Sequence, residues 1–490
     1  MSYSKSIFSV FLLMILAMGV VAQTNPADLD TTFGTNGKTT TDFAGSNDQA
    51  LALALLPNGK ILAAGYADMT PKTDFALARY NANGTLDTTF GTNGKTTTDF
   101  FDDADVAFGM AVFPDSKIIL VGSAYNGAGA DPIFALAKYN ANGTLDTTFG
   151  TGGKVTTTFT GTTKSHAFSV IILSDGKILV GGHADAISTL WDFALAKYNA
   201  DGSLDTTFGT GGKVTTDFSN TQEQGMDMVV LADGKILLVG CTNATPNYNF
   251  AMVRYNADGS LDTTFGTNGK TSTDFAGTND IINRAVILAE GKILVTGYSG
   301  SEGGNKNVAL ARYSANGILD TTFGTNGKVT TDFFGADDSG ENMKVFMNGK
   351  ILVVGSAYNG AYQDFALVRY NADGTLDTTF GTGGKSTTNI STMHDWIADI
   401  AIQTDGKILV AGGTSDVSIF DFALARYMGD PVSINLQIGA LPKAQAGLSE
   451  YVLALPFDST PRDVTVIRVN FSMQHKQFLK LAKDKCEIFV

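Results

Sequence analysis

The sequence predicts an all-β protein, a seven-bladed β-propeller whose blades each hold four antiparallel strands. Two observations predict this fold. The string Leu-Asp-Thr-Thr-Phe-Gly occurs seven times at intervals of 57 to 59 residues, and each interval contains four short runs of strand-forming residues separated by tight Gly-containing turns. Repeats of this kind are typical of propeller blades. The strings begin at Leu29, Leu86, Leu145, Leu204, Leu261, Leu319 and Leu376.

The chain opens with a predicted secretory signal peptide, residues 1–22. A short polar start is followed by an apolar run, Ile7–Val21, and by small residues up to Ala22. A membrane anchor is the alternative, but the run is short for a span, and no later stretch is long enough. We therefore expect a secreted or cell-surface protein with no transmembrane segment in the mature chain.

Each unit of the predicted propeller, residues 23–432, has the same order of strands. In the first unit the runs are Lys38–Phe43, Ala50–Leu56, Lys60–Ala64 and Asp74–Tyr80. Pro57-Asn58-Gly59 joins the second and third runs, and Asn-Gly pairs favour the primed turns of β-hairpins. A parallel β-helix, the competing repeat fold, does not need such turns.

The two ends of the repeat array predict how the ring closes. No strand precedes Lys38–Phe43, and no Thr-rich strand follows the last unit. We expect Lys38–Phe43 to form the outer strand of the blade built by residues 396–427, because this pairing removes an open sheet edge.

The repeated motifs resemble those of the delta-60 repeat family. The resemblance rests on the seven Leu-Asp-Thr-Thr-Phe-Gly-Thr-x-Gly-Lys strings, on x-Gly-Lys-Ile-Leu runs such as Asp175–Leu179, and on the Phe-Ala-Leu-Ala-(Arg/Lys)-Tyr runs, over about 400 residues. It implies a β-propeller in a secreted bacterial protein, and it implies no catalytic residue.

Residues 433–490 do not continue the repeat. Strand-like runs occur at Ser433–Ile438, Tyr451–Pro456 and Asp463–Phe471, and Gln474–Lys485 is predicted to be helical. The tail is a degenerate sorting domain, a small cap or a disordered segment. Two cysteines, Cys241 and Cys486, either form one disulfide or, as we favour, remain free thiols.

Charge and motif content restrict the function. The net charge of -14 argues against nucleic acid and anionic lipid as partners. We expect a monomer without a cofactor, although Asn256–Asp262 offers oxygens at alternate positions that suit calcium, as do Asn199–Asp205 and Asn371–Asp377. A plain glycine-containing turn is the interpretation that we favour for these loops.

Residues present in every unit are expected to build the unit. Asp30 and Asp87 represent the repeated acid, which we expect to accept hydrogen bonds from turn amides. Phe90 represents an aromatic residue wedged between blades. The repeated arginine, Arg79 in the first unit, is replaced by Lys138 and Lys197 in two others, which suggests a surface charge.

The units differ in two loops, one after the third strand and one after the Thr-rich strand. Both loops emerge on the same side of the ring, here called the variable face; the other side is the repetitive face. Exposed aromatic side chains mixed with carboxylates suit sugar rings or peptides. The candidate ligand-binding residues are Tyr125, Asp131, His183, Trp191, Tyr248, Tyr298, Glu302, Tyr358 and Tyr362 in one loop set, and Asp102, Asp103, Asp337, Asp338, His394, Asp395 and Trp396 in the other.

We therefore predict a binding or interaction module for a glycan or protein ligand. One alternative is a polysaccharide hydrolase or lyase, with Asp102–Asp103 or Asp337–Asp338 as paired acids. Adjacent acids on a surface loop are more often solvated, and the sequence shows no metal-ligand histidine pair and no Gly-x-Ser-x-Gly motif. The second alternative is a structural or adhesive repeat protein without a discrete ligand site.

Overall fold

The structure is a computed structural model. It describes residues 25–430, apart from 70–71, 126, 128–130, 162, 186–189, 219–220, 244–245, 276, 302–303 and 417–418, together with 450–453 and 467–470. The predicted signal peptide and Glu302 lie outside the described residues. The chain divides into two compact units, Met1–Gly429 and Asp430–Val490.

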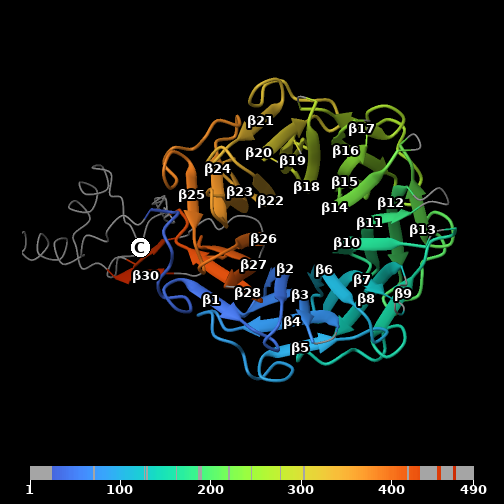
Figure 1. Cartoon of the computed structure of the whole chain (residues 1–490), viewed down its shortest axis with the longest axis horizontal. Coiled ribbons are helices and arrows are strands. Elements are labelled where there is room, and N and C mark those ends of the chain that lie inside the picture. The colour runs from blue at the N-terminus through green and yellow to red at the C-terminus, as the bar shows by residue number, and fades with distance from the viewer. Residues whose placement is uncertain are drawn as a thin grey trace, which may run out of the picture. The chain divides into compact units, whose positions relative to one another are not determined.

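The first unit is a seven-bladed β-propeller, as predicted (Figure 1). Its blades are four-stranded antiparallel sheets. Blade 1 contains β2 (Asp48–Leu55), β3 (Ile61–Asp68), β4 (Thr73–Tyr80) and β5 (Lys95–Thr98). Blade 2 contains β6 (Asp105–Val112), β7 (Ile118–Tyr125), β8 (Pro132–Tyr139) and β9 (Lys154–Thr157). Blade 3 contains β10 (Ser165–Ile172), β11 (Ile178–Asp185), β12 (Trp191–Tyr198) and β13 (Lys213–Thr216).

The remaining blades follow the same order from the axis outward. Blade 4 contains β14 (Glu223–Val230), β15 (Ile236–Asn243), β16 (Tyr248–Tyr255) and β17 (Lys270–Thr273). Blade 5 contains β18 (Asn279–Ile287), β19 (Ile293–Ser301), β20 (Gly304–Tyr313) and β21 (Lys328–Thr331). Blade 6 contains β22 (Asp338–Val345), β23 (Ile351–Tyr358), β24 (Gln363–Tyr370) and β25 (Lys385–Thr388). Blade 7 contains β26 (Asp395–Ile402), β27 (Ile408–Asp416), β28 (Ile419–Tyr427) and β1 (Lys38–Thr41).

The ring closes by the predicted pairing of its two ends. β1 runs antiparallel to β28, with Lys38 opposite Ala425 and Thr41 opposite Phe422. Tyr80 of blade 1 donates a hydrogen bond of 2.9 Å to the Thr41 hydroxyl across this seam. The N-terminal strand therefore covers the edge of β28 that would otherwise be open, and it ties blade 7 to blade 1.

The blades are held together by wedged side chains between neighbouring sheets. Phe90 is fully buried in a cluster that contains Leu62 of blade 1 and Leu120 of blade 2, which confirms its predicted place between blades. The middle strands are covered on both faces, so they are continuous apolar runs rather than alternating ones.

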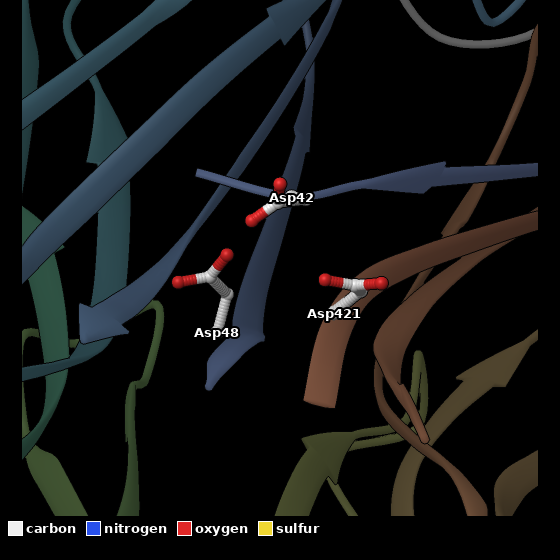
Figure 2. Close-up of side chains that lie close together, drawn as sticks. All are labelled: Asp42, Asp48 and Asp421. Carbon is white, nitrogen blue, oxygen red and sulfur yellow. The ribbon is translucent and has the colours of Figure 1, made fainter. Parts of the chain in front are cut away.

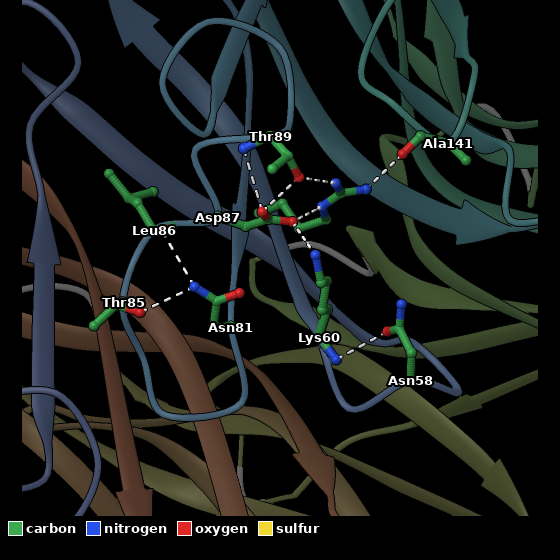
Figure 3. A network of polar contacts seen from close by, with 9 residues as sticks. Asn58, Lys60, Asn81, Thr85, Leu86, Asp87, Thr89 and Ala141 are labelled. Atoms are coloured by element: carbon green, nitrogen blue, oxygen red, sulfur yellow. Dashed lines mark hydrogen bonds and ion pairs between the residues drawn. The ribbon is translucent and has the colours of Figure 1, made fainter.

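The repeated arginine is not a surface charge, and that prediction is wrong. Arg79 Nε lies 2.6 Å from the Asp87 carboxylate, and Lys60 donates to the same oxygen (Figure 3). Asp87 also accepts hydrogen bonds from the Thr89 main-chain N–H at 3.3 Å, as predicted, and from the Thr89 hydroxyl at 2.7 Å. The equivalent Arg369 side chain is only 1% exposed. Lysine is tolerated in blades 2 and 3 because it reaches the same acid, although at a longer distance of 3.9 Å.

In the second unit, β29 (Glu450–Leu453) pairs with β30 (Ile467–Asn470) in antiparallel fashion. β30 falls within the predicted run Asp463–Phe471, and β29 overlaps the predicted run Tyr451–Pro456 but begins one residue earlier. Ser433–Ile438 and the predicted helix lie outside the described residues. Cys486 also lies outside them, and Cys241 is a buried free thiol on β15. Among the described residues, no helix is long and apolar enough to cross a membrane.

Candidate functional site on the variable face

The strand order places the two variable loop sets on one side of the ring. Connections such as β3–β4 and β5–β6 lie at the variable face, because each inner strand begins there and consecutive strands are antiparallel. The turns between inner and second strands lie on the repetitive face, together with the Asn-Ala-Asn-Gly connections. This separation of faces agrees with the prediction from the loop lengths.

Every inner strand carries a β-bulge at the same position. In β2 the bulge falls between Ala50 and Ala52, so Leu51 has no residue opposite it. Bulges of this kind redirect side chains and bend the strand, and here they leave one residue of each inner strand without a partner on the second strand. The bulged residues differ from blade to blade: Leu51, Phe108, Phe168, Met226, Asn283, Glu341 and Ala398.

Blade 3 carries a cluster of aromatic and imidazole rings at this side of the ring, here called the blade-3 cluster: His166, Phe168, His183 and Trp191. The His183 and Trp191 ring centroids lie 4.6 Å apart in an edge-on arrangement, and His166 lies 5.3 Å from each of them. Phe168 lies 5.2 Å from His183 and 4.5 Å from Phe108 of blade 2. The cluster therefore extends from β12 across β11 to the inner strand β10, where it meets blade 2.

The two histidines of the blade-3 cluster are uncharged at neutral pH. Burial lowers the pKa of His166 to about 4 and the pKa of His183 to about 3. His166 Nδ1 lies 2.6 Å from the Ser123 hydroxyl of blade 2, which fixes the ring. His183 was expected in an exposed loop, but it lies within β11 and is 5% exposed, since the rings of His166, Phe168 and Trp191 pack around it. Sequence reasoning missed His166 and Phe168, which lie in a strand rather than a loop.

The structure places the other predicted aromatic residues at strand ends or in the adjoining loops, half-buried. It brings some of them together in small groups and does not bring all of them into one site. Tyr362 contacts His394 at 5.3 Å between centroids, and Trp396 contacts Phe420 at 5.2 Å. The remaining ones are Tyr125, Tyr248, Tyr298 and Tyr358; the Tyr248 hydroxyl donates to Gln222 at 2.7 Å, and Lys306 lies 4.8 Å from the centre of the Tyr298 ring.

Asp338 is not a solvated loop residue, and that interpretation is wrong for it. It is the first residue of β22, it is 1% exposed, and its Oδ2 accepts the Phe333 N–H at 2.7 Å. Burial raises the pKa of Asp338 to about 7. Asp395 is equally buried. Six blades have an acid at this point: Asp48, Asp105, Glu223, Asp280, Asp338 and Asp395.

A signal for this ring of acids is present in the sequence. Each acid lies five residues after the Phe, or in one copy the Ile, that ends the Thr-rich run, and it accepts the N–H of that residue. By contrast, Asp102 is 95% exposed and only pairs with Lys72, at 3.2 Å. Asp103 and Asp337 are half-buried loop residues. The adjacent acids in the sequence are thus not paired acids in space.

A polar cluster from several inner strands lies around the axis. Arg284 of blade 5 contacts Asp227 of blade 4 at 3.1 Å and lies 3.7 Å from Asp399 of blade 7. Asn283 donates to Glu341 of blade 6 at 3.0 Å, and burial raises the pKa of Glu341. These side chains neutralise one another in part, and no simple sequence motif connects them.

The loops considered for calcium use their oxygens internally. Asp258 Oδ1 accepts from both the amide and the hydroxyl of Ser260, at 2.9 and 2.7 Å. Asp262 is paired with Arg254 and Lys235 at 2.7 and 2.9 Å. The loop is thus held as a hydrogen-bonded turn. On the repetitive face, a groove of about 450 Å³ lies between blades 3 and 4, lined in part by Ile171, Val230 and Ile236.

The closed ring and its seven repeated, bulged blades define a β-propeller repeat protein. Seven segments match the family described as "Domain of unknown function (DUF5122) beta-propeller", one in each repeat, at residues 56–90, 114–149, 173–208, 231–265, 289–323, 348–380 and 403–430. The more specific resemblance to the delta-60 repeat family stays a prediction. No curated protein matches the sequence.

Several solved structures resemble the ring at low sequence identity. The polysaccharide lyase Uly1 has 13% identity and a TM-score of 0.43, over 81% of this chain and 92% of that chain. Trypanosoma rangeli sialidase has 9% identity and a TM-score of 0.41, over 80% and 59%. A fungal alcohol oxidase of the AA5 family has 15% identity and a TM-score of 0.41, over 86% and 84%. These values carry no argument about what this chain binds.

Proposed function

We propose that the protein is a secreted or cell-surface binding module that takes a glycan at the variable face. The observation that carries this proposal is the blade-3 cluster. Seven copies of one scaffold differ at the side chains that face this side, and blade 3 alone replaces the acid that begins the inner strand by a small residue, Ser165. Rigid scaffolds commonly present their function on such individual positions.

The chemistry of the cluster favours a neutral, partly apolar ligand. Trp191 is half-buried and offers a ring face and an indole N–H, while the neighbouring imidazoles carry no charge at neutral pH. A sugar ring presents C–H groups on one face and hydroxyl groups around its edge. Aromatic faces can cover the former, and imidazole nitrogens can exchange hydrogen bonds with the latter.

Glycan binding can be measured directly on purified residues 23–490. The chain has two tryptophans, Trp191 and Trp396, and both lie at the variable-face side of their blades, so intrinsic fluorescence reports on this face. We expect binding to part of a polysaccharide array and a loss of affinity of at least about tenfold for Trp191→Ala. Ile318→Ala is the control, because Ile318 is 67% exposed in a loop of the repetitive face.

The outcomes separate the alternatives. Unchanged affinity in Trp191→Ala would contradict a site at the blade-3 cluster. Absence of binding across the array, from protein with the expected β-sheet circular dichroism, would favour a protein ligand or a structural repeat protein instead.

Polysaccharide cleavage is a second candidate function, favoured by one observation. Burial raises the pKa of Glu341, whose carboxyl group lies near the Arg284 guanidinium and accepts a hydrogen bond from Asn283 at 3.0 Å. If this group is a general acid, bound polysaccharides should release new reducing ends or unsaturated products, and Glu341→Gln should abolish the release without abolishing binding. Binding without any product would refute this candidate.

A further inference from the structure

Two groups of three carboxylates lie between neighbouring blades on the variable face. The seam cluster consists of Asp42, which directly follows β1, Asp421 of β28 and Asp48 of β2. It joins blade 7 to blade 1, and Figure 2 shows its three carboxyl groups close together, two on β2 and β28 and one on the residue that follows β1. The blade-1 cluster consists of the equivalent residues one blade further on: Asp74, Asp99 and Asp105.

The spacing of the oxygens fits one hard cation. In each cluster, one oxygen from each carboxylate lies within 4.8 Å of the other two. Calcium binds oxygens at about 2.3–2.6 Å, so two ligands on opposite sides of the ion are separated by up to about 5 Å. Three such carboxylates, completed by water or carbonyl oxygens, are a coordination set of the kind that calcium takes.

A second observation points independently to a ligand in the seam cluster. Asp48 is fully buried; its Oδ2 accepts the Phe43 N–H at 2.6 Å, but its Oδ1 has no hydrogen-bond partner among the described residues. Asp421 Oδ1 is also inaccessible, and no hydrogen-bond donor for it is found in the described part of the chain. Buried carboxylate oxygens without a donor are costly, and native proteins rarely leave them so. In the blade-1 cluster, Asp105 is fully buried and its Oδ1 is in the same state.

No ion pair with a basic side chain neutralises these charges in the described part of the chain. None of the six carboxylates forms an ion pair with a lysine or arginine among the described residues. The closest amines donate elsewhere: Lys95 Nζ bonds the Asp42 main-chain carbonyl and Lys154 Nζ the Asp99 carbonyl, both at 2.8 Å. Burial and the neighbouring acids raise the pKa of Asp48 and of Asp105 to about 7.

From these observations we propose that the seam cluster and the blade-1 cluster are two divalent-cation sites, with calcium as the ion. The seam site connects β1, β28 and β2, so an ion there fastens the two ends of the ring to each other. A third group, Asp192, Asp217 and Glu223, is not included. Glu223 already accepts bonds from Thr242 and Thr221, and it has no oxygen left without a partner.

The chain itself supplies the conservative variant. At the position of Asp421 and Asp74, blades 4 and 5 have Asn249 and Asn307, and both blades fold normally. Asp421→Asn and Asp74→Asn therefore each remove one charged ligand without introducing a residue that the blade cannot accommodate. Asp364→Asn is the matched control. It alters the same position in blade 6, where the cluster is not complete because its outer residue is Asn389.

The test is calorimetric titration of calcium into chelator-treated residues 23–490, paired with thermal unfolding with and without calcium. We expect about two sites per chain with a Kd on the order of 10⁻⁵ to 10⁻³ M, and a higher Tm in calcium. Each single variant should lose one site, the double variant both, and Asp364→Asn neither.

Two outcomes would overturn the proposal: no saturable heat and no Tm shift in millimolar calcium, or full stoichiometry in the double variant. If Asp421→Asn does not fold, Asp42→Asn tests the same site, since Asn389 occupies that position in blade 6. The titration uses the ion alone, so its result is independent of whether the protein binds a glycan.

Discussion

Replacing Asp338 by asparagine should remove a defined part of the pH dependence of stability. Asp338 is 1% exposed, and burial, together with the neighbouring Asp332, raises its pKa to about 7; the Phe333 N–H and Lys385 oppose this shift. Tyr370, which also faces it, has a raised pKa and stays neutral. The unfolded chain releases the Asp338 proton near pH 4, whereas the folded ring keeps it up to about pH 7.

The sign and size follow from this difference. Between these pH values the folded protein binds more protons than the unfolded protein, so the free energy of unfolding falls as the pH rises. Integrated from pH 4.5 to pH 7.5, one group with pKa values of about 3.9 unfolded and about 7 folded contributes a loss of about 3 kcal/mol. Asparagine has no such proton, so Asp338→Asn should lack this loss. Its amide oxygen can still accept the Phe333 N–H.

The assay is urea unfolding of wild type and variant at pH 4.5 and pH 7.5 in chelator, read by circular dichroism. The change in unfolding free energy between the two pH values is compared between wild type and variant. This comparison cancels the contributions of the other buried acids, and it cancels any pH-independent loss of stability that the asparagine causes. Asp337→Asn is the control for removal of one nearby carboxylate. If Asp338→Asn and the wild type lose the same free energy between the two pH values, the reasoning about this ring of acids is refuted.

Three other outcomes are expected. Asp377→Asn leaves Arg369, which is 1% exposed, without its partner at 2.6 Å and should cost about 3–5 kcal/mol of unfolding free energy; a cost below about 1 kcal/mol would contradict a buried ion pair. Gly202→Ala should be much more destabilising than Gly176→Ala in thermal unfolding. Both glycines have positive φ, of 89° and 80°, but only the first would place Cβ 2.9 Å from a phenylalanine ring, so equal Tm values would refute the wedge. NMR titration of His166 should show a neutral ring down to about pH 5, and a midpoint above pH 6 would show that the cluster is hydrated.

The architecture could be predicted because seven units carry the same strand-forming and turn residues at the same positions. Strand positions, the wedge of Phe90 and the seam between β1 and β28 all follow from residues shared by the units. The role of Arg79 could not be read in the same way. Because lysine replaces the arginine in two units, the sequence suggests that this side chain is exposed. The structure shows instead that both side chains contact the buried acid of their unit, Arg79 at 2.6 Å and Lys138 at 3.9 Å.

The candidate site was harder to predict because its residues come from the inner strands, where the copies differ. His166 and Phe168 lie in the inner strand β10, whereas the differences in loop sequence predicted residues such as Tyr358, which lies at the end of β23. The side of the sheet on which each inner-strand residue lies depends on the bulge after Ala50 and its equivalents. A bulge shifts the alternation of a strand without leaving a clear sequence mark.

The two faces of the ring have opposite energetic characters, and this contrast bears on function. On the repetitive face, repeated acids such as Asp87 are neutralised by an arginine and a lysine, or by two lysines in blades 2 and 3, which stabilises the charged form. On the variable face, acids such as Asp48 are buried without a cation and have raised pKa values. Groups that are costly in the isolated protein are most often found where a ligand, ion or partner completes them. The repetitive face therefore provides the stability of the scaffold, and the variable face is where binding partners should be sought.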